Sequence, residues 1–193
     1  MKTVFFDIDS QMDFVYPAGA LYVRGAERVV GAIARLNRYA AARGIPVVST
    51  MDAHEECDPE FALWPHHCVA GTLGQRKPES TLLERRVVVP NRACGAAIDG
   101  AQQILLEKQH VDMFTAVNLA RVLAELGAEE CVVYGVVTEV CVRHAALGLL
   151  GSGRRVTVVA DAIECLDAAA GGRAIEELAA AGGRLARVAE IAG

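Results

Sequence analysis

The 193-residue sequence lacks the features that mark several broad classes of protein. No segment approaches the roughly 18 consecutive apolar residues that a membrane-spanning helix requires, so we expect no membrane partner. Lys and Arg total 19 against 24 Asp and Glu, and the basic residues form no stripe. Because phosphate neutralisation supplies most of the affinity for nucleic acids, we expect no nucleic-acid partner either.

The amino end also lacks an uninterrupted apolar stretch and a cleavage site of small residues. Its short apolar run is broken by Asp7 and Asp9, unlike the core of a secretory signal peptide. The six cysteines show no CxxC spacing. These observations predict a cytoplasmic protein with reduced thiols, most of them buried core residues.

Short apolar runs alternate with longer amphipathic ones along the chain. The short runs predict strands and the helical spacing of the longer ones predicts helices. Strands are expected at 3–8, 46–51, 86–90, 103–108, 131–134 and 156–160, with a last short one near 185–188, and helices at 26–43, 115–126, 138–150 and 168–181. No linker or internal repeat interrupts this alternation. We therefore predict a single domain over residues 1–193, a three-layer αβα fold whose mostly parallel sheet of about six strands carries helices on both faces.

Polar side chains stand at the ends of several predicted strands. Asp9 ends the first strand, Asp52 and His54 follow the second, Lys108 ends the fourth, and a turn at Gly135 follows the fifth. In parallel sheets of this kind, ligands bind beyond the carboxyl ends of the strands. We therefore expect these groups to converge on one edge of the sheet and to form a site there.

A candidate nucleophile follows the fifth predicted strand. Thr138 is a suitable N-cap, which would place Cys141 near the third position of the next helix. There the free backbone N–H groups and the helix dipole favour a thiolate, and the same groups can hold an oxyanion. The local sequence fits equally well a small core residue that faces the sheet, as is expected for Cys131.

Lys108 and Asp9 are the candidate partners of this thiol. Lys108 would stabilise a thiolate and polarise the attacked group, although a lysine at a strand end is often simply solvated. Asp9 would act as the general base that takes the thiol proton and later delivers it to leaving ammonia. Alternatively, Asp9 only caps the turn that follows its strand.

The stretch from residue 52 to residue 80 is long and irregular, and a connection of that length is usually functional. It carries Asp52, His54, Glu60 and His67. Carboxylate and imidazole ligands suit Zn²⁺, Fe²⁺ or Mn²⁺, so the stretch is a candidate site for a divalent metal. The same residues also fit an ordinary polar surface. His66 has no evident role.

Three separated motifs resemble those of the isochorismatase-like cysteine hydrolase superfamily, and particularly of nicotinamidases. The segment 9–14 (DSQMDF) is similar to the superfamily's opening D-x-Q-x-D-F, and Lys108 falls where its lysine lies. The segment 135–142 (GVVTEVCV) resembles G-x-x-T-x-x-C-V, which carries the nucleophile. The resemblance implies that Asp9, Lys108 and Cys141 are catalytic. Isochorismatases proper lack this cysteine, so its presence favours an amidase.

The resemblance also implies further features of the site. A cis peptide between Val136 and Val137, rare for non-proline residues, would turn backbone N–H groups toward the oxyanion. Phe14 and Trp64 match the aromatic residues that enclose the substrate ring. The metal would orient that ring and would be held by Asp52, His54, Glu60 and His67. For Phe14 and Trp64, core or loop packing remains the alternative role.

The activity implied is hydrolysis of a small primary carboxamide through a cysteine thioester, above all of nicotinamide to nicotinate and ammonia. One alternative is another amidase of the superfamily, acting on a ureido, carbamoyl or other small amide. A second is a metallohydrolase in which Cys141 is incidental, and a third is a catalytically silent binding or assembly protein. Residues 109–115 lack the longer loop of many nicotinamidases, which leaves this pocket wall, including Phe114, undefined. We expect a homo-oligomer, as is common in the family.

Overall fold

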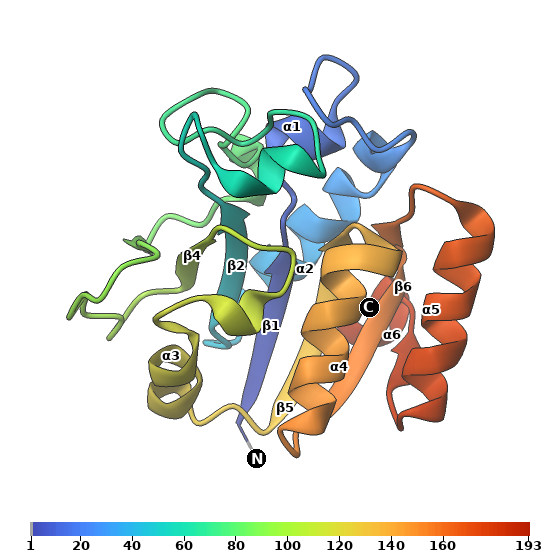
Figure 1. The fold of residues 1–193 in the computed structure, drawn as a ribbon. Helices are drawn as coiled ribbons and strands as arrows, with labels where there is room; N and C mark the ends of the chain where they lie inside the picture. Colours follow the sequence, from blue (N-terminus) through green and yellow to red (C-terminus); the bar gives the residue numbers. More distant parts are fainter. Residues whose placement is uncertain (1) are drawn as a thin grey trace.

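The computed structural model describes residues 2–193 and contains one sheet of seven strands in the order β3-β4-β2-β1-β5-β6-β7 (Figure 1). Each strand runs parallel to its neighbours. The strands are β1 (Thr3–Ile8), β2 (Val47–Asp52), β3 (Arg86–Val89), β4 (Gln103–Lys108), β5 (Glu130–Val136), β6 (Arg155–Glu164) and β7 (Arg184–Ala186). The predicted αβα fold is confirmed, and the short seventh strand is the one expected near residue 185.

Helices cover both faces of this sheet, as Figure 1 shows. One face carries α3 (Leu119–Leu126), α4 (Arg143–Gly151) and α5 (Ala168–Ala180), and the other carries α2 (Val30–Ala42) and α6 (Val188–Ala192). The short α1 (Met12–Val15) follows β1 at the carboxyl edge of the sheet. Within residues 2–193, no helix combines the length and the apolar character needed to cross a membrane.

The sheet separates two apolar cores because successive side chains of a strand point to opposite faces. In β1, Val4, Phe6 and Ile8 pack on the side of α3 and α4. Phe5 packs on the side of α2. All four are at most 2% exposed, so β1 is buried on both faces. This central position fixes the end of β1, where Asp9 follows.

Some predicted helices begin differently from expectation. The helix expected from residue 115 begins at Leu119, because Asp112 caps a separate 3₁₀ turn, Met113–Thr115, by accepting a hydrogen bond from Phe114 N at 2.9 Å. The helix expected over 26–43 is divided into a 3₁₀ turn, Ala26–Arg28, and α2. Local capping and turn geometry at these points overrode the apolar spacing.

Two further boundaries differ for similar reasons. The chain from Thr138 to Val142 forms a π-helical turn before α4, rather than the first turn of an α-helix. The last strand ends at Ala186, and Val188 begins α6, where the Glu190 carboxylate accepts a hydrogen bond from Arg187 N at 2.7 Å. Strand β5 also continues past the expected end at residue 134 to Val136. Gly135 therefore lies within the strand and not in a turn after it.

Candidate active site

The three predicted catalytic residues meet at the carboxyl edge of the sheet. Asp9 follows β1, Lys108 ends β4, and Cys141 lies in the π-helical turn after β5. Lys108 Nζ is 2.9 Å from Asp9 Oδ2, and the Cys141 thiol lies near enough to the Asp9 carboxylate to lower its pKa. None of the three is more than 7% exposed. A charged pair buried beside a thiol is an arrangement suited to proton transfer.

Thr50 of β2 holds the Asp9 carboxylate in place. Asp9 has φ of 43°, in the left-handed region that non-glycine residues rarely adopt. Its N–H donates to Thr50 Oγ1 at 3.1 Å, and Thr50 Oγ1 donates to Asp9 Oδ1 at 2.6 Å. The second carboxylate oxygen is thereby directed toward Lys108. Thr50 could not be predicted from the sequence, because a threonine inside a buried strand carries no functional signal.

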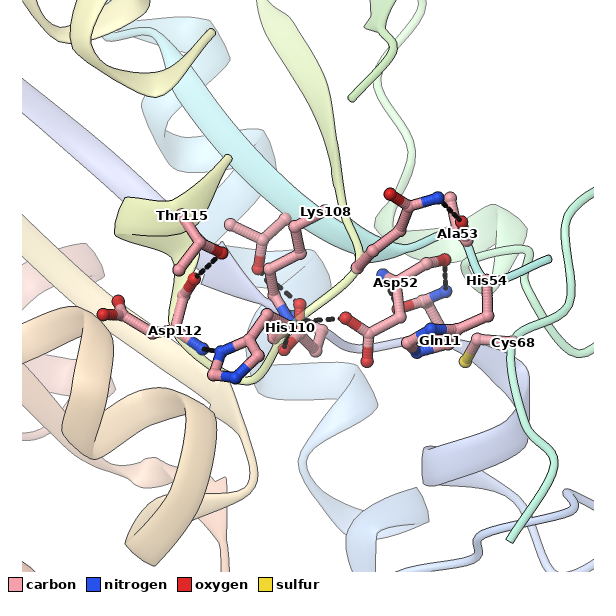
Figure 2. Close-up of polar contacts among 12 residues, drawn as sticks. Gln11, Asp52, Ala53, His54, Cys68, Lys108, His110, Asp112 and Thr115 are labelled. Atoms are coloured by element: carbon pink, nitrogen blue, oxygen red, sulfur yellow. Dashed lines mark hydrogen bonds and ion pairs between the residues drawn. The ribbon is translucent and has the colours of Figure 1, made fainter. Parts of the chain in front are cut away.

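Lys108 is fully buried between two carboxylates, so the solvated alternative is wrong. Its Nζ forms ion pairs with Asp9 and Asp52 and donates to His110 O at 3.0 Å (Figure 2). Burial opposes the ammonium charge, but the adjacent Asp52 and Asp9 outweigh it and raise the pKa of Lys108 well above its usual value. Lys108 is therefore a permanent cation in this site.

Lys108 also influences the pKa values of Asp9 and Cys141. Burial opposes the charge on Asp9, but the ion pair with Lys108 and the hydrogen bonds from Thr50, Lys108 and Cys141 lower the pKa of this carboxyl. Burial raises the pKa of Cys141 well above its usual value, and this effect, together with the Asp9 charge, outweighs the opposing effect of Lys108. The resting pair is a carboxylate beside a protonated thiol, as the general-base role predicted for Asp9 requires, although the helix position alone favours a thiolate. Asp9 is thus charged and able to accept the thiol proton.

The turn that carries Cys141 has an irregular backbone. The Val136–Val137 peptide is cis, as the resemblance implied. Gly135 has φ of 118°, and a Cβ at this position would collide with the backbone of Ile8. Thr138 does not cap the following turn, because its hydroxyl donates to Glu164 O at 2.9 Å. The predicted N-cap is therefore wrong, and Thr138 instead ties the nucleophile turn to the end of β6.

Asp52, His54 and His67 form a buried cluster next to Lys108. One ligand atom from each lies within 4.8 Å of the others. His67 Nδ1 is 2.6 Å from Pro65 O, an acceptor, so Nδ1 carries the proton and Nε2 presents a lone pair. His67 Nε2 is 3.8 Å from Asp52 Oδ2. The predicted metal ligands Asp52, His54 and His67 are thus brought together.

Two orphaned atoms at this cluster fit a cation. Within residues 2–193, the buried atoms His54 Nε2 and Glu60 Oε2 have no hydrogen-bond partner. Such atoms are costly unless something else satisfies them. Glu60, the fourth predicted ligand, belongs to a second potential metal-binding group with His54 and Asp58. Two carboxylates and two imidazoles suit Zn²⁺, Fe²⁺ or Mn²⁺. The residues present therefore fit a divalent metal.

The opening motif also has a structural role at this cluster. The Gln11 side chain donates to Asp52 O at 2.8 Å and accepts from Asp52 N at 2.7 Å (Figure 2). Asp13 Oδ2 accepts from Cys68 N at 2.7 Å. These contacts tie the ends of β1 and β2 and the loop after His67 into one unit. Their partners lie far apart in the sequence, which is why the motif alone did not reveal them.

A pocket joins the nucleophile to the metal-like cluster, defined as the four candidate metal ligands Asp52, His54, Glu60 and His67. Its lining residues are Phe14, Leu21, Val23, Asp52, Glu60, Trp64, His67, Val111, Val137, Val140, Cys141 and Leu166. Phe14 and Trp64 line it as expected, and the Phe14 ring lies 5.3 Å from that of His67. Phe114 does not line the pocket. Its ring packs beside Gly148 of α4, and Val111 forms that part of the wall instead. Leu21, Val23 and Leu166, which also line the pocket, lie in loops without periodicity, so sequence patterns gave no signal for them.

The cysteines are less uniformly buried than expected. All six are free. Cys68, Cys131 and Cys141 are buried, Cys94 and Cys165 are partly exposed, and Cys57 is exposed. His66 is exposed and stacks on Phe61, with ring centroids 4.1 Å apart, so it stays outside the metal-like cluster.

The chain is similar to known proteins over most of its length. The isochorismatase domain family matches residues 3–190 of the chain. A nicotinamidase of Acinetobacter baylyi is 25% identical over 180 residues, which cover 83% of this chain and 80% of the relative.

Solved structures share the fold over nearly the whole chain. The pyrazinamidase of Pyrococcus horikoshii, crystallised in complex with zinc, superposes with a TM-score of 0.80 at 25% identity, covering 97% of this chain and 99% of its own. The N-carbamoylsarcosine amidase of Thermoplasma acidophilum superposes with a TM-score of 0.79 at 26% identity, covering 100% of both chains. Different amides are therefore named for proteins of very similar overall structure.

Proposed function

The chain belongs to the isochorismatase family, and from this premise we propose that it is a cysteine-dependent amidohydrolase whose substrate is nicotinamide. The observation that carries the proposal is the buried group of Asp9, Lys108 and Cys141, which opens onto a mostly apolar pocket. The nicotinamidase of A. baylyi and the pyrazinamidase of P. horikoshii, both similar in sequence to this chain, support an aromatic carboxamide as substrate.

Acylation begins with proton transfer from Cys141 Sγ to the Asp9 carboxylate. The sulfur attacks the amide carbon, so that a C–S bond forms and the carbonyl oxygen becomes an oxyanion. The proton held by Asp9 then passes to the amide nitrogen, the C–N bond breaks, and ammonia leaves. Water attacks the resulting thioester while Asp9 accepts its proton, which returns to Sγ as the acid departs.

Fixed charges and dipoles support these steps. Lys108 stays cationic between Asp9 and Asp52 and stabilises the thiolate once it has formed. The backbone N–H groups of Val137 and Cys141 would hold the oxyanion. The Asp9 carboxylate remains oriented throughout, because Thr50 and Lys108 occupy separate oxygens of it.

The metal-like cluster would serve substrate orientation. Asp52, His54, Glu60 and His67 would hold a divalent ion, which supplies a Lewis-acid anchor for the pyridine nitrogen. Phe14 and Trp64 would enclose the ring and direct its carboxamide toward Cys141. The zinc complex of the P. horikoshii pyrazinamidase and the orphaned atoms of His54 and Glu60 support this part of the proposal.

The charge of the pocket favours a neutral substrate over an anionic one. Among residues 2–193, those that line the pocket include no Arg or Lys, whereas Asp52 and Glu60 both face it. The nearby cation, Lys108, is already paired with two carboxylates. Apart from the proposed metal ion, a substrate carboxylate, such as that of N-carbamoylsarcosine, would therefore find no unpaired cation there. A neutral ureido or carbamoyl amide remains the second candidate, supported by the similarity to the T. acidophilum enzyme.

Ammonia release from nicotinamide, followed for the wild type, Cys141→Ala and Cys131→Ala, tests the proposal. Cys131 is a buried cysteine that pairs with Val4 near the start of β1, whereas Asp9 follows the end of that strand, so its variant is the matched control. We expect the control to be active and Cys141→Ala to lose roughly a thousandfold or more in kcat. Chelation should raise KM. Full activity of folded Cys141→Ala together with complete loss on chelation would overturn the proposal in favour of a metallohydrolase.

A further inference from the structure

Asp58 lies next to the metal-like cluster and makes contacts with two of its members. Its Oδ2 is 3.0 Å from His54 Nδ1, and its Oδ1 accepts a hydrogen bond from Glu60 N at 2.9 Å. The second contact caps the 3₁₀ turn Pro59–Ala62, which carries Glu60. One carboxylate therefore connects the imidazole of His54 with the turn that presents the Glu60 side chain.

The contact with Asp58 determines the tautomer of His54. An ionised carboxylate can only accept hydrogen bonds, so Nδ1 must carry the imidazole proton. Nε2 of the neutral ring then presents its lone pair, which is the form that binds a metal. The His54 side chain is fully buried, and its Nε2 has no hydrogen-bond partner within residues 2–193. Because Nδ1 is taken by Asp58, Nε2 is the atom of His54 left to serve the cluster with Asp52 and His67.

Capping alone does not account for Asp58. The cap requires only Oδ1, and any small polar residue that accepts from Glu60 N could supply it. The ring plane of His54 is also fixed by Phe61, whose ring centroid lies 5.2 Å away. Outer hydrogen-bond partners of this kind orient metal-binding imidazoles and make them better ligands.

We propose that Asp58 is a positioning residue for a divalent metal, which fixes His54 with Nε2 directed into the cluster and holds Glu60 beside it. This inference rests on the metal part of the proposed function and not on amide hydrolysis. It predicts that Asp58 affects metal affinity without contacting substrate.

Asp58→Asn is the informative variant because it preserves shape and reverses one hydrogen bond. The Asn oxygen can still accept from Glu60 N and cap the turn. Its NH₂ group then faces His54 Nδ1 and favours the tautomer with the proton on Nε2, which cannot bind a metal. The matched control is Glu56→Gln, which removes a nearby exposed carboxylate by the same chemical change.

Zinc affinity is measured on metal-free proteins by competition with a chromophoric chelator. We expect Asp58→Asn to bind zinc about 10- to 100-fold more weakly than the wild type, and Glu56→Gln to be unchanged. Equal affinities of Asp58→Asn and wild type, or no zinc binding by the wild type, would overturn the inference. Ammonia release from nicotinamide is assayed separately, so failure of the metal role and failure of the amidase proposal are distinguishable.

A second measurement needs no stable Asp58 variant. The ¹⁵N resonances of the His54 imidazole in metal-free wild type, assigned by comparison with His54→Gln, report which nitrogen is protonated. We expect the proton on Nδ1, and in Asp58→Asn, where that variant folds, on Nε2. A purely structural cap would not move this proton. A wild-type ring protonated on Nε2 would contradict the inference.

Discussion

Replacing Lys108 by Met removes the one cation between two buried carboxylates and leaves a side chain of similar length. Breaking a buried ion pair by deleting one partner costs about 3–5 kcal/mol, because a charge remains buried without compensation. Lys108 pairs with both Asp9 and Asp52, all nearly inaccessible to solvent. For a domain of this size, we expect Tm to fall by roughly 6–20 °C. Arg28→Met is the control, because its ion pair with Glu164 is exposed and should contribute about 1 kcal/mol or less.

The pH dependence of the stability lost in Lys108→Met identifies the cause of that loss. In the wild type the pKa of Asp9 is lowered from 3.8, so its contribution to stability is present above that value and lost below it. Without Lys108, burial raises the pKa of Asp9 and keeps that of Asp52 raised. The penalty of the variant is then largest at neutral pH and declines as these carboxyls protonate.

Thermal unfolding of both proteins, with a chelator present, tests this reasoning at about pH 7.5 and about pH 5. The difference in Tm between wild type and Lys108→Met should narrow at the lower pH. A difference no larger than that of Arg28→Met, or one that widens on acidification, would refute the assignment of Lys108 as a compensated buried cation.

Two further predictions concern the nucleophile and the pocket. Asp9→Asn removes both a charge and a hydrogen bond that raise the pKa of Cys141, so the pH midpoint of Cys141 alkylation by iodoacetamide should move down while ammonia release is lost. A midpoint that is unchanged or higher would contradict the role of Asp9 as the proton acceptor. Trp64, the single tryptophan of the sequence, lines the pocket, so nicotinamide should quench the fluorescence of Cys141→Ala saturably. Trp64→Leu should raise KM for nicotinamide roughly two- to twelvefold, the equivalent of one aromatic pair, with kcat nearly unchanged; loss of kcat alone would argue against a ring-binding role.

The parts of the fold predicted best are those whose local pattern agrees with their tertiary setting. The strands at Thr3–Ile8 and Gln103–Lys108 were predicted at their observed bounds, because both are apolar runs buried in the centre of the sheet. The helix start at Leu119 was missed because Asp112 stabilises a separate turn before it. Thr138 resembles an N-cap, but a hydrogen bond to Glu164, which is distant in sequence, takes its hydroxyl.

The candidate site likewise has residues that could be predicted from the sequence and features that could not. Asp9, Lys108 and Cys141 could be predicted because strand ends and motifs mark them, and the structure brings them together. The protonation state of Cys141 could not be predicted from the sequence, because it depends on burial and on charges from other strands. Asp58 was missed although the Asp-Pro pair before Glu60 is a recognisable cap signal. That signal predicts a turn. The role in positioning a metal ligand follows only from the contact of Asp58 with His54 in the folded chain.

In the proposed mechanism, Cys141 attacks the amide carbon and carries the acyl group. This step is tested most directly by mixing wild-type protein with nicotinamide, quenching in acid during turnover, and mapping any adduct by mass spectrometry of the peptides. We expect a nicotinoyl thioester on Cys141, absent from Cys141→Ala and unaffected in Cys131→Ala. Turnover of nicotinamide by Cys141→Ala at the wild-type rate, or an acyl adduct on a different residue, would contradict the mechanism.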